Sequence, residues 1–568
     1  MRKNPEFLMR FQLFLLFISF GTSLLAQDLG NLKDKKPVQL HAGINLAVQA
    51  YQSNLENPIQ PGLSWYLTGS PVLEIYGFSL PFYFLFSNQQ RNIQQPFNEF
   101  GVSPYYKWAK LHLGYFNPVY SPFTLAGKRI LGTGVELNPG KFRFAAAYGR
   151  FRKPIQYENT PGTSTTYLLP GSEPSYKQIG YSVKIGIGSE RNFIDLIYLK
   201  GRDVPESNLF PSDLEKAPEE NAVIGLSHRI TFTEWLSWSA DLAVSAYTRD
   251  QFSEILPDTT IPAQKFISNI MLPRESSQVY SAAESKLTIG SRPFSISLKY
   301  RRIDPDYKSM GAYFFQTDLQ SFSLAPRLIL EDGKYVLSGS IGRQTDNLYG
   351  QKLATTKRII GSVQLMLQPS PDFNLSAQYS NYGLSQAALN PNLPDTVIIA
   401  QVSHQALVSP RFSFGENLRQ SINPSFSYYA LTGLDASIGS IKSWNVGISY
   451  GLQNRVQKWS QQFTLLFRSS QLTLGHLTTY GALWSIQKPF FDNRFNSSFQ
   501  LAYYQNYQPE NPDEKGNLIS LMGNVSYRLF KKHQIRLQYA FRRNKAPLAS
   551  FGQDFLENRG FLIYSLQF

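Results

Sequence analysis

The sequence predicts an all-β protein: one large antiparallel transmembrane β-barrel behind an export signal. Three observations lead there. Apolar and polar residues alternate over long stretches, tight turns alternate with longer polar connections, and the composition is poor in charge and rich in aromatic residues, with 17% charged residues, 33 Tyr and 41 Phe. Disordered chains show the opposite composition. The length of 568 residues does not fix a domain number, because barrels depart from the soft rule of about 150 residues per domain.

The N-terminus has the three parts of a signal peptide. Arg2, Lys3 and Arg10 are basic, and a mostly apolar stretch follows over residues 11–20. Ala26 then offers a small residue for cleavage. About 10 apolar residues are too few for a membrane helix, which needs about 20. We therefore expect a signal peptide over 1–26, cleaved near Ala26, and a short periplasmic segment over 27–37.

The mature chain contains no feature of a lipid anchor or a membrane helix. Cysteine is absent, which excludes a disulfide scaffold and the cysteine that a lipoprotein signal requires. No apolar run after the signal approaches 18 residues. Any membrane crossing must therefore be made by strands.

The strand pattern begins at Val38. From 38 to 51, every second residue is apolar, and this stretch exceeds the roughly 9 to 11 residues with which a tilted strand crosses a membrane. Similar alternation recurs over 179–187, 236–245, 294–301, 373–379 and 535–541. Strands of soluble sandwiches usually have about 5 to 6 residues, so the longer runs favour a barrel.

The connections support the same architecture. Gly, Pro, Asn and Asp mark tight turns at 138–141, 188–191, 290–292, 331–334 and 369–372. Longer polar connections are expected at 152–175, 201–219, 248–276, 349–356 and 507–515. Short periplasmic turns and long extracellular loops alternate in this way in outer-membrane barrels. Together, the strands and connections predict a barrel over 38–568 with both termini in the periplasm. The predicted number of strands is about 26, or 24 if 82–115 or 461–486 pair differently.

The last strand ends in an aromatic residue. Leu562, Tyr564, Leu566 and Phe568 share one face. A terminal strand of this kind looks like the signal that hands outer-membrane barrels to the barrel assembly machinery, which we therefore expect as a partner during biogenesis.

Three segments of the first quarter resemble a known group of proteins. These are 100–108 (FGVSPYYKW), 111–115 (LHLGY) and 134–144 (GVELNPGKFRF). They are similar to the N-terminal part of large, poorly characterised outer-membrane β-barrel proteins of Bacteroidota. The resemblance implies an outer-membrane location, and it brings no catalytic residues to carry over.

The predicted barrel leaves open what fills its lumen. Only 27–37 precede it, too little for the plug domain of an energised receptor or for a periplasmic module, and no peptidoglycan-binding domain follows Phe568. Barrels of 16 to 18 strands already enclose an aqueous channel. We expect inward-folded loops, above all 248–276, or a partner protein inside, in preference to an empty pore.

The net charge of +15 has two interpretations. Basic residues are scattered, without the cluster or module of a nucleic-acid-binding protein, so no nucleic acid is expected. Several fall on the lumen-facing phase and would favour anions or an acidic partner: Arg143, Lys184, Lys299, Arg301, Arg327, Arg536 and Arg542. Alternatively, bases near strand ends meet phosphates of outer-membrane lipid and lipopolysaccharide.

No enzymatic site emerges. The six His are widely separated, and none belongs to a His-x-x-x-His pair, so no metal, cofactor or catalytic residue is expected. Two classes of function remain. The first is a channel or a transport or secretion conduit, plugged by its own loops or a partner. The alternative is a non-conducting structural or assembly component that anchors or accommodates a surface lipoprotein or a secretion-system subunit.

Overall fold

The computed structural model describes the chain from Val38 to Gln567 with internal gaps. The gaps are 56–59, 89–97, 157–173, 209, 211–215, 257–264, 266, 313–315, 353, 389–399, 434–439, 473–474 and 548–551. The expected signal peptide over 1–26, the segment 27–37 and Phe568 lie outside the described residues. Within those residues, no helix is long and apolar enough to cross a membrane.

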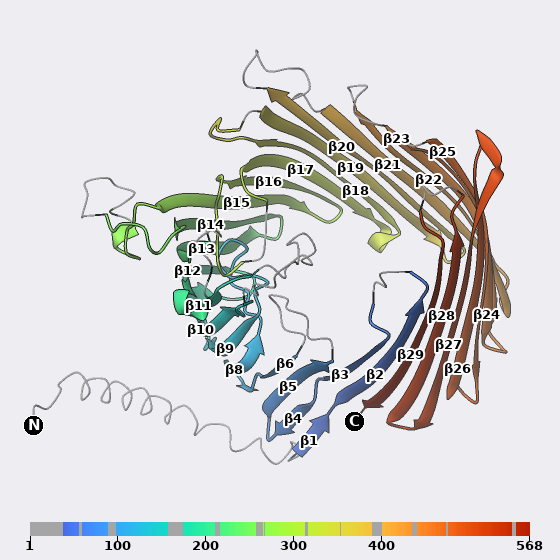
Figure 1. The fold of residues 1–568 in the computed structure, drawn as a ribbon, viewed down its shortest axis with the longest axis horizontal. Helices are drawn as coiled ribbons and strands as arrows, with labels where there is room; N and C mark the ends of the chain where they lie inside the picture. Colours follow the sequence, from blue (N-terminus) through green and yellow to red (C-terminus); the bar gives the residue numbers. More distant parts are fainter. Residues whose placement is uncertain are drawn as a thin grey trace, which may run out of the picture.

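The fold is a closed antiparallel β-barrel of 26 strands, which confirms the predicted fold and strand number (Figure 1). The ladder closes where β2 pairs with β29, from Gly43 opposite Gln567 to Ser53 opposite Glu557. The 29 hydrogen-bonded segments are β1 (Val38–His41), β2 (Gly43–Ser53), β3 (Leu63–Gly69), β4 (Val72–Ile75), β5 (Phe78–Ser87), β6 (Glu99–Val102), β7 (Tyr105–Tyr106), β8 (Ala109–Phe116), β9 (Ile130–Leu137), β10 (Phe142–Arg152), β11 (Lys177–Gly188), β12 (Phe193–Val204), β13 (Glu220–Thr233), β14 (Leu236–Thr248), β15 (Ser277–Ser291), β16 (Phe294–Ile303), β17 (Leu319–Leu330), β18 (Tyr335–Asp346), β19 (Ala354–Ser370), β20 (Phe373–Ala388), β21 (Ala400–Phe414), β22 (Leu418–Gly433), β23 (Ile441–Asn454), β24 (Trp459–Leu472), β25 (Gly475–Phe490), β26 (Phe495–Gln508), β27 (Asn511–Phe530), β28 (His533–Lys545) and β29 (Phe555–Gln567).

Three of the first four strands are interrupted, which reduces 29 segments to 26 strands. The breaks lie at Ala42, between β1 and β2, at 70–71, between β3 and β4, and at 103–104, between β6 and β7. Pro71 and Pro104 occupy two of these breaks, and a proline cannot donate to a strand ladder. The next two strands are short, with eight residues each in β8 and β9, whereas β19 has 17 and β22 has 16.

The five predicted tight turns are confirmed. They join the antiparallel pairs β9 and β10, β11 and β12, β15 and β16, β17 and β18, and β19 and β20. All five lie at one end of the barrel, which we call the turn end. Gly140 and Gly333 occupy positive-φ positions in two of them. The first described strand begins at Val38, and the two ends of the barrel meet at the turn end because the number of strands is even. The opposite end is called the loop end.

One predicted connection is wrong. Residues 507–515 were expected to form a long polar loop, but β26 and β27 continue as a hairpin with Gln508 opposite Asn511. The strands therefore extend beyond their neighbours, and only residues 509–510 turn. The polar composition of the segment reflects a solvated hairpin, which alternation of apolar residues cannot reveal.

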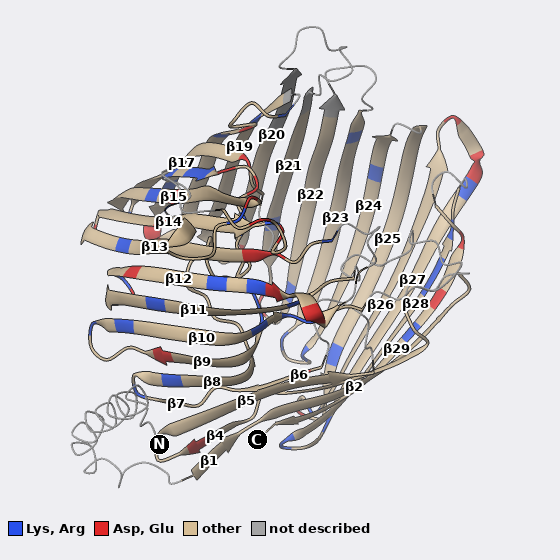
Figure 2. Cartoon of the chain, turned by 60° about the vertical axis from the view of Figure 1, so that its left-hand side comes forward, with Lys and Arg blue, Asp and Glu red and all other residues tan. Residues whose placement is uncertain are grey.

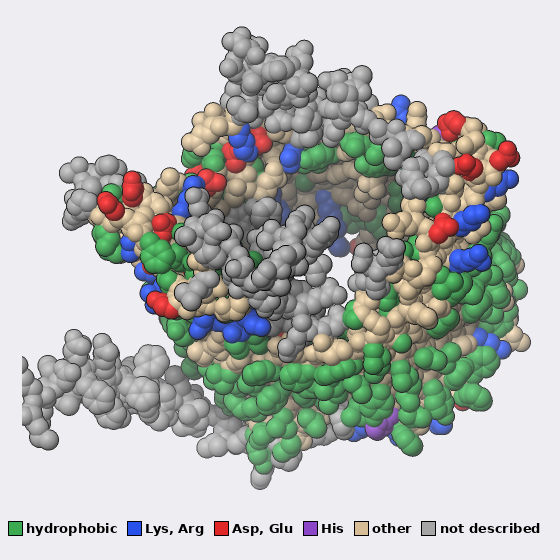
Figure 3. Space-filling model, viewed as in Figure 1, with side chains coloured by type: hydrophobic (Ala, Val, Ile, Leu, Met, Phe, Trp, Pro, Cys, Tyr) green, Lys and Arg blue, Asp and Glu red, His purple; other side chains and the backbone are tan. Residues whose placement is uncertain are grey.

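The outer surface of the barrel is apolar. Large side chains on the outward phase are exposed, such as Tyr148 at 58% and Leu196 at 56%. Others in this set are Leu46, Leu113, Ile185, Leu337, Ile448, Leu465, Leu537 and Leu562. Hydrophobic side chains cover the lower and right-hand outer surface in Figure 3. An apolar exterior on a closed ladder is what a lipid bilayer requires, because no backbone group is left unpaired.

Candidate functional site in the lumen

Two connections fold into the lumen and bind each other there (Figure 1). The first, residues 117–129, joins β8 to β9, and the second, residues 304–318, joins β16 to β17. The Ala126 N–H donates to the Gly311 carbonyl over 3.1 Å. The Tyr307 hydroxyl donates to the Phe123 carbonyl over 2.8 Å, and the Ser309 hydroxyl to the Thr124 carbonyl over 2.5 Å. We call the described parts of these two segments the inward loops.

The inward loops carry a hydrophobic core inside the barrel. Phe123 and Leu125 are fully buried, and Tyr307 and Met310 are 3% exposed. Their partners come from the inner face of the wall between β8 and β17: Phe116, Ile130, Ala147, Leu199, Val223, Ala243, Ala282, Ile303 and Leu319. Burying one such side chain contributes about 1.5 to 3 kcal/mol. The loops are therefore held by the same force that stabilises a globular core.

Asn221 fixes the second inward loop to the wall. This fully buried side chain of β13 accepts a hydrogen bond from the Met310 N–H over 3.0 Å and donates to the Lys308 carbonyl over 3.2 Å. Ser245 of the neighbouring β14 also donates to the Lys308 carbonyl, over 2.7 Å. Gly201 admits the loop closely, since a Cβ there would lie 3.0 Å from Met310.

The connection that was expected to fold inward does not do so in its described part. Ile267 and Met271 of 249–276 pack on Ala222 and Ala246. These alanines are on the outward phase of β13 and β14, alternating with the lumen-facing Asn221. The segment therefore covers the outside of the wall, where it protrudes beyond the ring (Figure 1). Polarity and length alone cannot tell to which face a loop packs.

Lys and Arg are spread over many strands of the wall (Figure 2). Four of the predicted lumen bases form two groups, each around one acid. Arg143 makes a two-pronged contact with Asp195, at 2.8 and 2.9 Å, and Lys184 lies 4.0 Å from the same carboxylate. Lys299 and Arg301 contact Glu284 at 2.8 and 3.6 Å. Each acid offsets one of its two positive charges, so these groups contribute less positive charge than the sequence suggested.

The other three predicted bases are separate from these groups. The strand register places Arg327 opposite Ser295, which lies on the same face of β16 as Lys299. It places Arg536 opposite Ser526 and Arg542 opposite Ser520. The seven bases therefore occupy three regions of the wall and do not form one ring.

A lysine of the first inward loop has a perturbed pKa. Burial, with the nearby Arg152 and against the opposing effect of Asp203, lowers the pKa of Lys128 from 10.5 to about 8. A buried amine loses hydration, and this disfavours its charged form.

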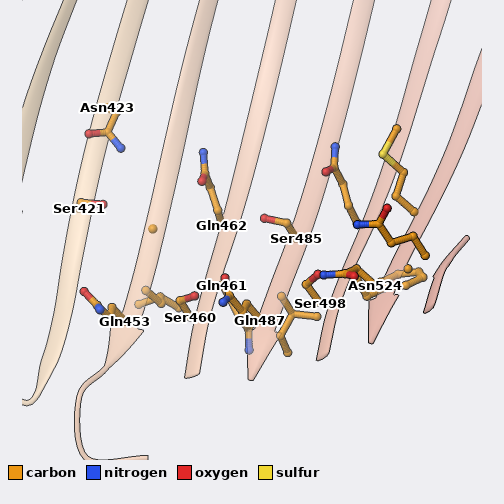
Figure 4. Close-up of a pocket in the computed structure, with 18 of the residues that line it drawn as sticks. Ser421, Asn423, Gln453, Ser460, Gln461, Gln462, Ser485, Gln487, Ser498 and Asn524 are labelled. Atoms are coloured by element: carbon orange, nitrogen blue, oxygen red, sulfur yellow. The ribbon is translucent and has the colours of Figure 1, made fainter. Parts of the chain in front are cut away.

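The wall across the lumen has a different character. A recess of about 740 Å³ lies on the inner face of β21 to β28 (Figure 4). Its lining includes six glutamines, two asparagines and four serines, with Arg411 and Arg419 as the only charged side chains of that lining. No inward loop packs on these residues within the described chain, and an opening through the molecule remains beside the packed region (Figure 3).

One hydrogen-bonded chain has the residue types of a hydrolase. Ser103 lies 2.9 Å from His112 Nδ1, and His112 Nε2 lies 2.8 Å from Glu136. The Ser103 N–H, however, donates to the Pro81 carbonyl, so it is not free to stabilise an oxyanion. We regard the chain as a polar link between strands. Among the described residues, no three His, Asp or Glu side chains gather as metal ligands would.

Sequence reasoning missed the inward loops and Asn221. A signal exists in 117–129, whose residues Val119, Tyr120, Phe123 and Leu125 are unusually apolar for an exposed connection.

Comparisons with known proteins do not assign the chain to a family. No protein-family model and no curated protein matches the chain. The chain is similar to the solved P pilus usher (PapC) translocation pore, with 9% identity and a TM-score of 0.38, over 93% of this chain and 99% of that one. It is also similar to OpdK of Pseudomonas aeruginosa with vanillate (11% identity, TM-score 0.31, 62% of this chain, 93% of that one). OccAB3 of Acinetobacter baumannii gives 15% identity and a TM-score of 0.32 over 66% of this chain and 98% of that one.

Proposed function

We propose that the protein is an outer-membrane conduit whose lumen is narrowed, on one side only, by its own inward loops. The observation that carries this proposal is the contrast between the two walls. The wall of β8 to β17 has an apolar core with the loops, whereas the wall of β21 to β28 presents polar side chains on which no described loop packs. A purely structural barrel would gain stability from packing both walls, so the polar wall indicates contact with water or with a solute.

The apolar outer surface and the closed ladder support a membrane location, and the expected signal peptide supports the outer membrane. Of the two arginines that line the recess, Arg419 contacts Asp372 at 3.0 Å, which leaves Arg411 without an acidic neighbour in that lining, and the groups around Asp195 and Glu284 each contain two bases and one acid. We expect a modest preference for anions on this basis.

Planar-bilayer recording of the purified full-length protein tests the proposal. A stable current with a reversal potential shifted toward that of chloride in a KCl gradient is the expected result. Silence in bilayers that conduct with a reference porin would contradict it and favour the alternative, a barrel that anchors or accommodates a lipoprotein or secretion subunit. A partner of that kind would co-purify in mild detergent.

A further inference from the structure

The polar wall is built as a row. Because antiparallel register places lumen-facing residues of neighbouring strands side by side, the printed pairs connect seven strands without interruption. The row runs from β22 to β28 through Arg419, Gln453, Ser460, Gln487, Ser498, Asn524 and Gln538. Neighbouring strands lie about 4.8 Å apart, so the row extends about 30 Å around the wall.

A second row lies directly above the first. It contains Ser421, Gly451, Gln462, Ser485 and Gln500. Figure 4 shows Ser421, Gln462 and Ser485 of this row, and all five residues line the same recess. The apolar residues of the same strands, such as Ile486 and Phe499, alternate with them and belong to the outward phase.

Two amides that line the recess have unused hydrogen-bonding capacity. Asn423 and Asn524 each have a buried side-chain oxygen without a partner in the described chain. Unpaired buried polar atoms are costly, and they usually have a partner that is a solvent molecule or a ligand. Amide side chains both donate and accept, as do hydroxyl groups.

We infer that this wall is a binding track for an uncharged, hydroxyl-rich chain, that is, a neutral glycan, which the proposed conduit carries. The inference rests on that proposed function. A sugar hydroxyl also donates and accepts, so every sugar unit matches a row of amides and serines, and a neutral chain avoids the cost of moving charge. A polypeptide is a poorer match, because its apolar side chains would find only Met522 and Ala540 on the lumen phase of the recess.

Current blockage by maltohexaose, a neutral glucan, tests the track. Dimethyl-capped polyethylene glycol of the same length accepts hydrogen bonds at its ether oxygens and donates none, so it measures obstruction without donor contacts. We expect maltohexaose to stay bound longer than polyethylene glycol. The double variant Gln487→Leu with Asn524→Leu should shorten its residence about tenfold, since two hydrogen bonds of about 0.7 kcal/mol each amount to that factor.

The matched control is Gln364→Leu with Gln378→Leu. These two amides face each other on the lumen phase of β19 and β20, outside the recess. They should leave the residence time unchanged. Equal blockage by both polymers, or an equal effect of both double variants, would overturn the inference while leaving the conduit intact, as would preferential blockage by an uncharged unfolded peptide.

Calorimetric titration of the detergent-solubilised full chain with maltohexaose separates the two proposals. Binding that the recess variant weakens about tenfold would support the track even if no current were recorded. Absence of current together with absence of binding would remove both.

Discussion

Asn221 connects the barrel wall to a loop that lies 87 residues away in the sequence. Its amide meets a backbone N–H and a carbonyl of that loop at once, and it is fully buried. Replacing it removes the acceptor of the Met310 N–H inside a low-dielectric core, while the Lys308 carbonyl keeps the hydrogen bond from Ser245. Leaving a buried donor without an acceptor costs more than losing the hydrogen bond alone.

We predict that Asn221→Leu releases the second inward loop. The loss of about 3 kcal/mol corresponds to roughly a hundredfold faster hydrogen exchange of the Met310 amide. Asn445→Leu on the opposite wall, where the native side chain bonds to Ser427 and Arg468, should leave that exchange unchanged. Slow exchange at Met310 in Asn221→Leu would show that the apolar core alone holds the loop.

Lys128 makes the docking of the first inward loop depend on pH. Its pKa is lowered to about 8 in the docked state, so the released loop binds more protons between pH 8 and about 10.5. Docking therefore strengthens as the pH rises through this window, and it is weakest below pH 8. Lys128→Met should stabilise docking at pH 7 and make no difference above about pH 10.5. Proteolysis of the loop at both pH values measures this, and an equal effect of the variant at both would contradict it.

At the residue scale, alternation predicts the face of the strand on which a residue lies, but it does not predict which residues that side chain contacts. Alternation identified Arg143 and Lys299 as lumen-facing candidates, and the register gives each of them an acidic neighbour that no spacing announces. Asn221 has the same phase as many polar residues and differs from them only through its contact with a distant loop.

At the element scale, the two inward loops meet at a glycine. A Cβ on Gly311 would lie 2.2 Å from Leu199 and 2.7 Å from the Thr124 carbonyl, so no larger residue fits. The loop end of the packed wall therefore depends on this close approach.

Gly311→Val should separate the inward loops and widen the passage. We expect a higher single-channel conductance, by about twofold or more, and greater entry of large antibiotics into cells. Gly523→Val provides the control, because a Cβ there meets nothing within 4 Å. Unchanged conductance in Gly311→Val, with the protein folded, would show that the loops do not limit the current.

Strands and tight turns were predictable because their signals are local: a period of two and residues that favour turns. The face of the wall on which each connection packs was not predictable. The described part of 249–276 packs outside on alanines that are distant in the sequence, and 117–129 packs inside on residues that include a distant leucine. The hairpin at 507–515 shows the same limit, because a polar strand has no apolar alternation to reveal it.

At the scale of the whole molecule, closure by β2 and β29 leaves no unpaired edge. Deleting residues 555–568 should therefore abolish assembly, with loss of the heat-modifiable band on a semi-native gel, because two open edges would face lipid. Deleting 509–515 from the projecting hairpin should preserve that band. A heat-modifiable band without β29 would mean that β2 and β28 close a smaller barrel.

The unequal strand lengths have a consequence for the surrounding bilayer. β8 and β9 have eight residues each, fewer than the roughly 9 to 11 that cross a bilayer of about 30 Å, whereas β19 and β22 exceed that span. Lipids meet this mismatch by compressing beside the short strands, at a cost of a fraction of a kcal/mol per Å. We therefore expect the membrane to be thinner along this flank, and neighbouring molecules with equally short flanks would lower the cost of thinning by gathering there.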